Sequence, residues 1–417
     1  MTQYAAYVGW DWADKKHDLC LVEAATGKKE ASVIKHTPQA IEEWAASLRL
    51  RFDGRKVAVC LEQSRGPLIF ALLKYDFLVL YPVNPSTLAK YREAFSPSRA
   101  KDDPQDAEYA AELVMHHRER LKAWHPEDVK TRTLQYLVEH RRRVVSDRTR
   151  VSNRMTALLK LYFPQVLQWF DDIRTALVCD FLLQWPTLEE VKRVRRPTLE
   201  KFFRAHHSIS TKTNEARLSS IKEAIPLTND RAVIDSSAVM IKVLAHQMKV
   251  AIAAIKDFDD KIAELCAAHD DFHLFASLPG SGTVYSSRLL AAFGTDREKY
   301  QSADEVARFS GIAPVIERSG ESCWIRWRYF CPKFLRQSFV EYAGESVKHS
   351  FWARAYYEQQ RAKGKSRQAA VRALAFKWIR IIYRCWQTKT EYNEVKYLEG
   401  LRKKGSSLLG YAASNAT

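Results

Sequence analysis

The sequence predicts three successive parts: an α/β domain, an elongated helical region and a mostly helical domain. In the first quarter of the chain, short apolar runs that end in acidic residues alternate with helical patterns. The middle carries apolar residues at a spacing of seven, and the last part carries glycine turns between helical patterns. Because 417 residues exceed the size of one compact core, we expect two globular domains with a connecting region between them.

The first domain, over residues 1–120, begins with three short apolar runs that predict strands. These are Tyr7–Trp10, His17–Glu23 and Ala31–Ile34. Helices and strands then alternate, with helices predicted at 38–50, 67–74 and 103–116 and strands at 57–62 and 78–81. Three strands in a meander followed by alternating strands and helices is the order of elements in the ribonuclease H-like fold.

Four carboxylates fall at the ends of these elements. Asp11 closes the first apolar run, Glu62 closes the fourth, and Asp103 and Asp106 lie one helical turn apart. Carboxylates that meet repel one another unless a cation joins them, and two Mg²⁺ or Mn²⁺ ions about 4 Å apart would hold the attacking and leaving oxygens of a phosphodiester. The pattern therefore indicates nucleic-acid cleavage or strand transfer.

Spacing alone leaves two alternatives open for these acids. Any single acid at a strand end or helix start is more often solvated or a helix N-cap. Asp102 and Asp106, four residues apart, share a helix face as well as Asp103 and Asp106 do.

The charge balance indicates a polyanionic partner. Lys and Arg number 66 against 49 Asp and Glu, which gives a formal net charge of +17 and a pI near 9.5. We find no signal peptide and no apolar run long enough to span a membrane, so a membrane partner is not expected. The seven dispersed cysteines are typical of reduced thiols in a cytoplasm.

The middle region, 121–270, has the apolar spacing of a coiled coil. Ile234, Ile241, Met248, Ile255 and Ile262 recur every seven residues, and a weaker seam runs through 137–158. The two helices could pair as an antiparallel hairpin in one chain or join two chains. The first helix is also basic, and phosphate contact by Arg141, Arg142, Arg143 and Arg148 is as well supported as a solvated charged face.

The last domain, 271–390, precedes a basic tail over 391–417. Gly280 and Gly282 form a turn like that of helix-hairpin-helix modules, whose free amides bind phosphate, although plain interhelix turns are common. Aromatic residues alternate with arginines over 324–329, as in segments that stack on bases, or in a buried amphipathic strand. The residues of this domain that we expect to bind nucleic acid are Gly280, Gly282, Arg326, Arg328 and Lys365.

Taken in order, these motifs resemble the DEDD transposases of the insertion-sequence-110 family. The resemblance lies in Asp11, Glu62, the segment Lys101-x-Asp103-x-x-Asp106-Ala107, the segment Leu278-Pro279-Gly280-x-Gly282-x-x-Tyr285, and Gly311-x-x-Pro314-x-x-x-x-Ser319-Gly320. It continues through 356–383, which is similar to the closing helices of the family.

The resemblance implies a recombinase with a composite site. A RuvC-like domain would hold two metal ions through Asp11, Glu62, Asp103 and Asp106, and Ser319 would attack a DNA phosphate to form a phosphoserine link. A structured noncoding bridge RNA would pair with donor and target DNA. A dimer or tetramer, with sites shared between chains, would act in a bacterial or archaeal cytoplasm at the nucleoid.

Two other functions fit the same residues. A RuvC-type junction nuclease would need the four acids but not Ser319. A non-catalytic nucleic-acid-binding protein would need neither, and its affinity would fall steeply with salt.

Overall fold

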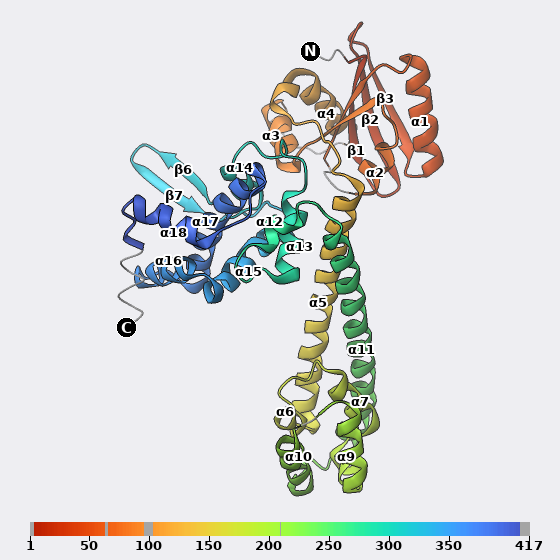
Figure 1. Ribbon diagram of the computed structural model, residues 1–417. Helices are drawn as coiled ribbons and strands as arrows, with labels where there is room; N and C mark the ends of the chain where they lie inside the picture. Colours follow the sequence, from red (N-terminus) through yellow and green to blue (C-terminus); the bar gives the residue numbers. More distant parts are fainter. Residues whose placement is uncertain (1–3, 63–65, 96–102, 209, 409–417) are drawn as a thin grey trace. The chain divides into compact units, whose positions relative to one another are not determined.

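The computed structural model describes residues 4–62, 66–95, 103–208 and 210–408 (Figure 1). The chain forms two compact units, 1–126 and 127–417. Unit 1 has hydrophobic cores on both faces of a sheet, and unit 2 has one core near its C-terminal helices and another around the far ends of two long helices.

Unit 1 is built on a five-stranded mixed sheet with the strand order β3-β2-β1-β4-β5. Strands β1, β2 and β3 form an antiparallel meander, and β4 and β5 run parallel to β1. The predicted strands are confirmed, each within a few residues of its expected bounds. They are β1 Ala6–Trp12, β2 Lys16–Glu23, β3 Lys29–Lys35, β4 Val57–Leu61 and β5 Leu78–Pro82.

Helices cover both faces of this sheet (Figure 1). Helices α1 (Pro38–Arg51) and α2 (Pro67–Leu72) pack on one face, and α4 (Asp103–His117), followed by the short η1 (Arg118–Arg120), packs on the other. Helix α3 (Pro85–Phe95), which was not predicted from the sequence, lies on the α4 side. Its only fully buried residue is Leu88, so it lacks the apolar stripe that reveals a helix in a sequence.

Two long helices, α5 (Val129–Tyr162) and α11 (Arg231–Ala267), lie side by side in unit 2 (Figure 1). They run antiparallel. Thr131, near the start of α5, hydrogen-bonds with His269, just after the end of α11. Later in α5, Arg141 pairs with Asp259, which comes earlier in the chain than His269. The seven-residue seam of α11 is buried at Ile241, Met248, Ile255 and Ile262. The helices therefore pair within one chain, while coiled-coil packing in the strict sense stays a prediction.

A group of short helices closes the far end of this pair. Their apolar side chains form one core with residues of α5 and α11, including Met155, Leu159, Ile241 and Leu244. The helices are α6 Val166–Trp169, α7 Ala176–Gln184, α8 Leu188–Lys192, α9 Arg196–Ala205 and α10 Thr211–Glu223.

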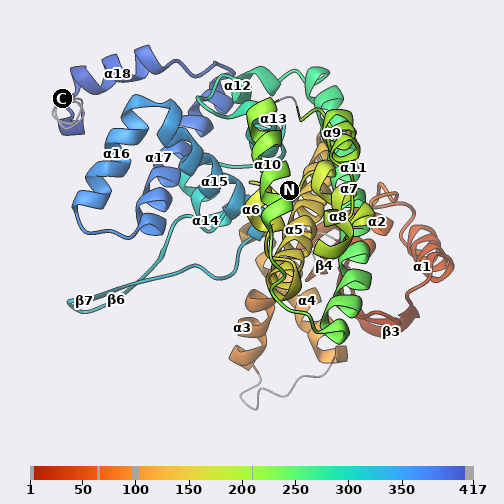
Figure 2. The ribbon, with the colours of Figure 1, turned by 90° about the horizontal axis from the view of Figure 1, so that it is seen from below.

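The rest of unit 2 is helical apart from one hairpin. The hairpin strands are β6 (Val315–Ser319) and β7 (Ser322–Arg326), and Figure 2 shows them projecting from the helices of this unit. The helices are α12 Phe272–Ala276, α13 Gly282–Phe293, α14 Ala303–Phe309, α15 Lys333–His349, α16 Phe351–Ala362, α17 Arg367–Thr388 and α18 Glu394–Lys403.

By length and composition alone, one described helix is apolar enough to cross a membrane. It is α11, in which an 18-residue stretch has a mean hydropathy of 1.6 and is 28% buried. The expectation that no run of this kind exists was therefore wrong. A single such helix is weak evidence for a membrane span, and the buried face of α11 packs against α5 and α7.

Candidate active site

The sheet of unit 1 brings several acidic residues to one edge. Trp10 of β1 is paired with Leu61 of the parallel β4, so Asp11 and Glu62 follow at the same level. Side chains alternate between the two faces of a strand. Tyr7 and Cys60 belong to the core on the α4 side, so Asp11 and Glu62, two or four residues further on, lie on that face as well. We call this end of the sheet, with the first turn of α4, the acid edge.

A further carboxylate, Asp18, belongs to the acid edge and was missed in the sequence. Asp18 on β2 is directly opposite Asp11 in the antiparallel ladder, and only 6% of it is exposed. Residues opposite each other in such a ladder point to the same face. Asp18 lies at every second position of β2 together with Cys20 and Val22, which face the α4 side, and this spacing can be read from the sequence. Its position opposite Asp11 depends on the register between β1 and β2, which the sequence does not reveal.

Helix α4 approaches β1 so closely that the strand can carry only glycine at the point of contact. A Cβ atom on Gly9 would lie 1.8 Å from the carbonyl oxygen of Ala107 and 2.4 Å from the amide nitrogen of Ala111. Just beyond the other end of the helix, Arg118 donates a hydrogen bond of 2.8 Å to the Tyr7 hydroxyl. Helix α4 therefore runs antiparallel to β1, and its first turn lies toward Asp11.

The first turn of α4 begins at Asp103 and contains Asp106. Asp103 is partly buried, and the Asp106 side chain is only 4% exposed. Lys101 and Asp102 lie outside the described residues. The alternative register through Asp102 is therefore untested.

Asp106 is held by an arginine from α3. The Arg92 guanidinium donates from Nη1 to both carboxylate oxygens of Asp106, at 2.6 and 2.7 Å. The hydrogen bonds with Asp106 raise the pKa of Arg92, and the charges of Asp106, Glu62 and Glu93 raise it further. The positive charge of Arg92 thus already lies among the acids of this edge. This arginine was not predicted from the sequence.

The side chains of the acid edge do not close into a metal cage. Among the described residues, no three His, Cys, Asp or Glu side chains come together in a way that could hold a metal ion. The donors are carboxylate oxygens, which suit hard cations such as Mg²⁺ and Mn²⁺. The Cys60 thiol, two residues before Glu62, is unsuited as a ligand, because burial, followed by the charge of Glu62, raises the pKa of Cys60 to about 12. The residues fit a divalent cation, provided that Arg92 releases Asp106.

Ser319 lies at the turn of the hairpin in unit 2. It is the last residue of β6 and is paired with Ser322, the first residue of β7, across a loop of Gly320 and Glu321. Gly320 has a φ of +56°, a conformation that favours glycine in such a tight loop. Both serines are exposed, and no described residue hydrogen-bonds with the Ser319 hydroxyl. The Ser319 hydroxyl is therefore exposed without a hydrogen-bonded base among the described residues.

The base of the hairpin is fixed, in contrast to its turn. The Trp327 ring is contacted by the guanidinium groups of Arg336 and Arg372, with carbon-to-centroid distances of 4.6 and 3.6 Å. Arg336 also donates to the carbonyl of Arg328 and, at 2.5 Å, to the Cys331 sulfur. The strands carry exposed apolar side chains at Ile316, Trp324 and Ile325, so the predicted extended segment is present but is not a buried strand.

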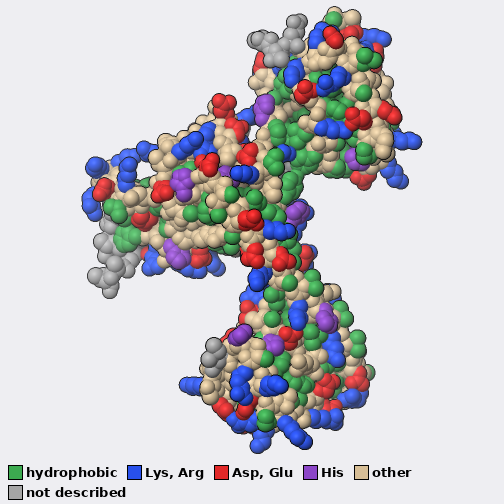
Figure 3. Space-filling model, turned by 45° about the vertical axis from the view of Figure 1, so that its right-hand side comes forward, with side chains coloured by type: hydrophobic (Ala, Val, Ile, Leu, Met, Phe, Trp, Pro, Cys, Tyr) green, Lys and Arg blue, Asp and Glu red, His purple; other side chains and the backbone are tan. Residues whose placement is uncertain are grey.

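The predicted nucleic-acid-binding residues lie in several places within unit 2. Most of them have partners in the protein: Arg141 pairs with Asp259, Arg142 with Glu341, Arg326 with Glu317, Arg328 donates to the Ala313 carbonyl, and Lys365 donates to Gln360. Arg143 is exposed, and Arg148 is half-buried. Gly280 and Gly282 flank the turn between α12 and α13, both with positive φ. Figure 3 shows Lys and Arg side chains spread over the visible surface with acidic groups between them.

Two family models match this chain, one in its N-terminal part and one in its C-terminal part. A transposase model of the DEDD IS110 type matches residues 8–164, which include the acid edge. A model of the transposase IS116/IS110/IS902 family matches residues 272–358, which include Ser319.

Similar proteins include products of insertion elements from Streptomyces and Mycobacterium. The mini-circle protein named as transposase for IS117 in Streptomyces coelicolor is 24% identical over 398 residues, which cover 93% of this chain and 95% of the relative. An uncharacterized 42 kDa protein of IS900 from Mycobacterium paratuberculosis is 23% identical over 387 residues, or 90% and 94% of the two chains. An uncharacterized 44.8 kDa protein of IS116 from Streptomyces clavuligerus is 26% identical over 68% of this chain and 70% of its own length. The chain is a DNA transposase and belongs to the IS110 family of DEDD transposases.

Proposed function

We propose that this transposase cuts and exchanges DNA strands through a metal-bound acid edge and a serine nucleophile. The observation that carries the proposal is the placement of Asp11, Glu62 and the first turn of α4 at one edge of a ribonuclease H-like strand order. A chain that only bound nucleic acid would not need to hold carboxylates together against their mutual repulsion. The serine at an exposed turn supplies the second half of the chemistry.

The metal ions would be held by Asp11, Glu62, Asp103 and Asp106. A pair of Mg²⁺ or Mn²⁺ ions would supply charge stabilisation for the phosphate under attack. Asp18, opposite Asp11 in the ladder, would orient that carboxylate. Arg92 would leave Asp106 when the site loads and would then carry its charge to the neighbouring DNA phosphate.

Ser319 would carry out the covalent step. Its Oγ attacks the phosphorus atom of the DNA backbone, a new bond from Oγ to phosphorus forms, and the bond from phosphorus to the leaving sugar oxygen breaks. The proton of the serine hydroxyl is transferred to the leaving oxygen, so charge balances. The phosphoserine link keeps the energy of the phosphodiester, which a second strand can then use without added nucleotide.

Specificity and assembly extend the proposal. A bridge RNA that pairs with donor and target DNA would leave the protein to recognise backbones, which agrees with its net charge of +17. The acids and Ser319 belong to different units of the chain, so a dimer or tetramer in which one chain's acid edge serves another chain's serine is compatible with the fold.

A covalent-adduct assay tests the proposal. The full chain is incubated with Mg²⁺, the RNA transcribed from its element, and labelled donor and target DNA, and a denaturing gel is examined for a protein–DNA adduct. The adduct should vanish in Ser319→Ala and in Asp11→Ala. It should persist in Ser322→Ala, which removes an equally exposed hydroxyl directly across the same hairpin.

Other outcomes identify the competing functions. Metal-dependent nicking that survives Ser319→Ala would make the protein a RuvC-type nuclease. Binding without cleavage under all metal conditions would leave only nucleic-acid affinity. A mixture of Asp11→Ala and Ser319→Ala chains that regains activity supports sites shared between chains, and an inactive mixture supports sites built within one chain.

A further inference from the structure

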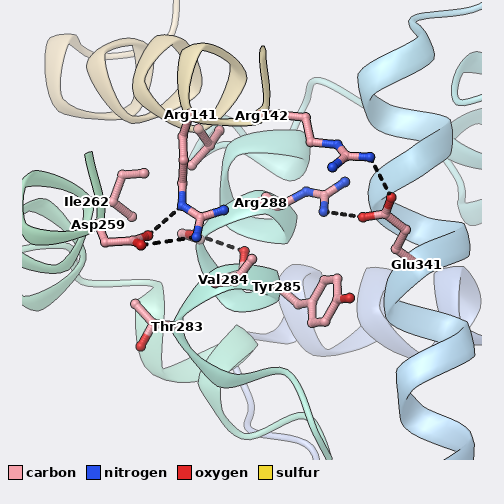
Figure 4. A pocket seen from close by; sticks show the side chains of 11 residues that line it. Arg141, Arg142, Asp259, Ile262, Thr283, Val284, Tyr285, Arg288 and Glu341 are labelled. Atoms are coloured by element: carbon pink, nitrogen blue, oxygen red, sulfur yellow. Dashed lines mark hydrogen bonds and ion pairs between the residues drawn. The ribbon is translucent and has the colours of Figure 1, made fainter. Parts of the chain in front are cut away.

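A cavity of about 180 Å³ lies within unit 2, where helices α5, α11, α13 and α15 meet (Figure 4). Its walls carry three arginines, Arg141, Arg142 and Arg288, and two acids, Asp259 and Glu341. Positive charge therefore exceeds negative charge by one in a small, partly enclosed volume. The chemistry proposed above does not use this cavity.

Arg288 is the most unusual group in the cavity wall. Only 5% of the residue is exposed, and its guanidinium donates from Nε to Ser338 at 3.1 Å and from Nη1 to Glu341 at 2.6 Å. Its third nitrogen, Nη2, is buried and has no hydrogen-bond partner among the described residues. A buried donor on a charged group without a partner is costly, and it indicates that a ligand supplies the acceptor.

The neighbouring arginines are arranged around the same acids. Arg142 donates to the second oxygen of Glu341 at 3.1 Å, and Figure 4 shows Arg142 and Arg288 reaching toward this one carboxylate. Gln337 also donates to Glu341, at 2.7 Å. Two arginines thus share one carboxylate, so one positive charge is left for an incoming anion. Burial lowers the pKa of Arg288, and the charge of Arg142 lowers it further, so an added anion would stabilise the charged form.

The start of helix α13 contributes donors of another kind. Thr283 and Val284, in the first turn of this helix, line the cavity. The first amides of a helix have no intrahelical partner, and no described side chain caps this helix start. Backbone amides at a helix start bind phosphate oxygens, and the fork of an arginine matches phosphate geometry.

We propose that this cavity binds one backbone phosphate of the nucleic acid on which the transposase acts, between the start of α13 and the guanidinium groups of Arg142 and Arg288. The inference rests on the proposed function for the identity of the polyanion. It adds a defined anchoring point that contains none of the residues proposed to react. The bound phosphate would also supply the hydrogen-bond acceptor that Nη2 of Arg288 lacks among the described residues.

The first test measures binding of labelled duplex DNA and of the element's RNA by the full chain at several salt concentrations. Arg142→Gln should weaken binding about tenfold and reduce the salt slope by about one. Arg154→Gln, which changes an exposed arginine further along the same helix that does not line the cavity, is the matched control and should have a smaller effect. Equal losses of affinity in the two variants would overturn the proposal, because Arg142 would then contribute no more to binding than an exposed arginine does.

A second pair of variants covers the case in which Arg142→Gln disturbs folding. Thr283 is exposed at the cavity mouth, and a carboxylate in the first turn of a helix stabilises the helix. Thr283→Glu should therefore fold at least as well as the wild type while it repels phosphate, and Thr283→Gln is its uncharged control. Weaker binding in Thr283→Glu alone supports the proposal, and unchanged binding in both overturns it.

Inorganic phosphate separates a backbone site from a site for the free anion. Phosphate at constant ionic strength should raise the melting temperature of the wild type but not of Thr283→Glu. If phosphate stabilises the protein but neither Arg142→Gln nor Thr283→Glu weakens nucleic-acid binding, the cavity binds a free anion and the proposal is wrong. The Ser319 adduct is scored independently, so loss of the proposed function and loss of this inference give different results.

Discussion

The acid edge of unit 1 and the serine hairpin of unit 2 differ in how they are supported. The acid edge lies on the central strands of a sheet, with Asp106 buried and clamped by Arg92. Ser319 lies on a two-stranded hairpin whose strand residues are almost all exposed. Packing fixes the position of the Asp106 carboxylate at the acid edge. In the hairpin, packing fixes only the base of the two strands.

This difference indicates a division of work. Divalent cations demand fixed ligand positions, which a sheet and a closely packed helix provide. A nucleophile that must reach a phosphate on a separate molecule benefits from a projecting turn. Trp324 and Ile325 are exposed on the same hairpin. The four predictions below test this comparison.

The largest expected effect separates activity from stability. Asp106→Asn and Ser319→Ala should each reduce strand transfer at least about 10³-fold, because each removes a group that the proposed chemistry requires. Only Asp106→Asn should also destabilise the protein, by about 3 kcal/mol, because it leaves Arg92 without its buried partner. Urea unfolding monitored by circular dichroism measures this. Equal stability of the two variants would show that the acid edge is no better supported than the hairpin.

The second prediction concerns the contact between α4 and β1. Gly9→Ala places a methyl group against the backbone of α4, so the helix must move, and the free energy of unfolding should fall by about 3 kcal/mol. Gly344→Ala is the control, because the nearest atom to its Cβ would be 3.8 Å away and alanine favours the interior of α15. That variant should gain up to about 1 kcal/mol. Unfolding of both variants by urea gives the comparison.

The third prediction concerns the cation already present at the acid edge. Arg92→Gln should increase the affinity for Mn²⁺ about tenfold, since Asp106 no longer has to exchange one cation for another. Arg118→Gln changes the same residue type near the opposite end of α4 and should leave metal affinity unchanged. Titration calorimetry on metal-free protein measures both. Weaker binding in Arg92→Gln would show that Arg92 orients Asp106 for the metal instead of competing with it.

The smallest effect concerns pH. His17 on β2 is fully buried and its Nε2 lies 2.9 Å from Nδ1 of His36; burial, followed by the charge of His36, lowers the pKa of His17 to about 4. Because this folded pKa is below the unfolded value, the neutral ring stabilises the fold above about pH 6.5, and this contribution is lost as the pH falls toward 4.

At pH 5 the wild type should therefore lose about 1 kcal/mol more, relative to pH 7, than His17→Gln loses. Unfolding in urea at the two pH values measures this difference. A larger acid loss in the variant than in the wild type would rule out His17 as the source.

The sequence predicted the strands of unit 1 well, because each is a short apolar run bounded by polar residues. It also placed Asp11 and Glu62 at strand ends, which is enough to bring them to one edge of a sheet. It could not place Asp18, since the pairing with Asp11 depends on register, nor Arg92, which lies on a helix without an apolar stripe. The cavity around Arg288 draws on four helices distant in sequence, and no local pattern reveals such a meeting.

The length of α5 has a consequence for the scale of the complex. Its 34 residues, at a rise of about 1.5 Å each, span about 50 Å between the core of the C-terminal helices and the core of α6 to α10. Along a DNA duplex this distance corresponds to about 15 base pairs. A change in the length of the helix pair by whole turns would change the separation of these two cores by about 5.4 Å for each turn.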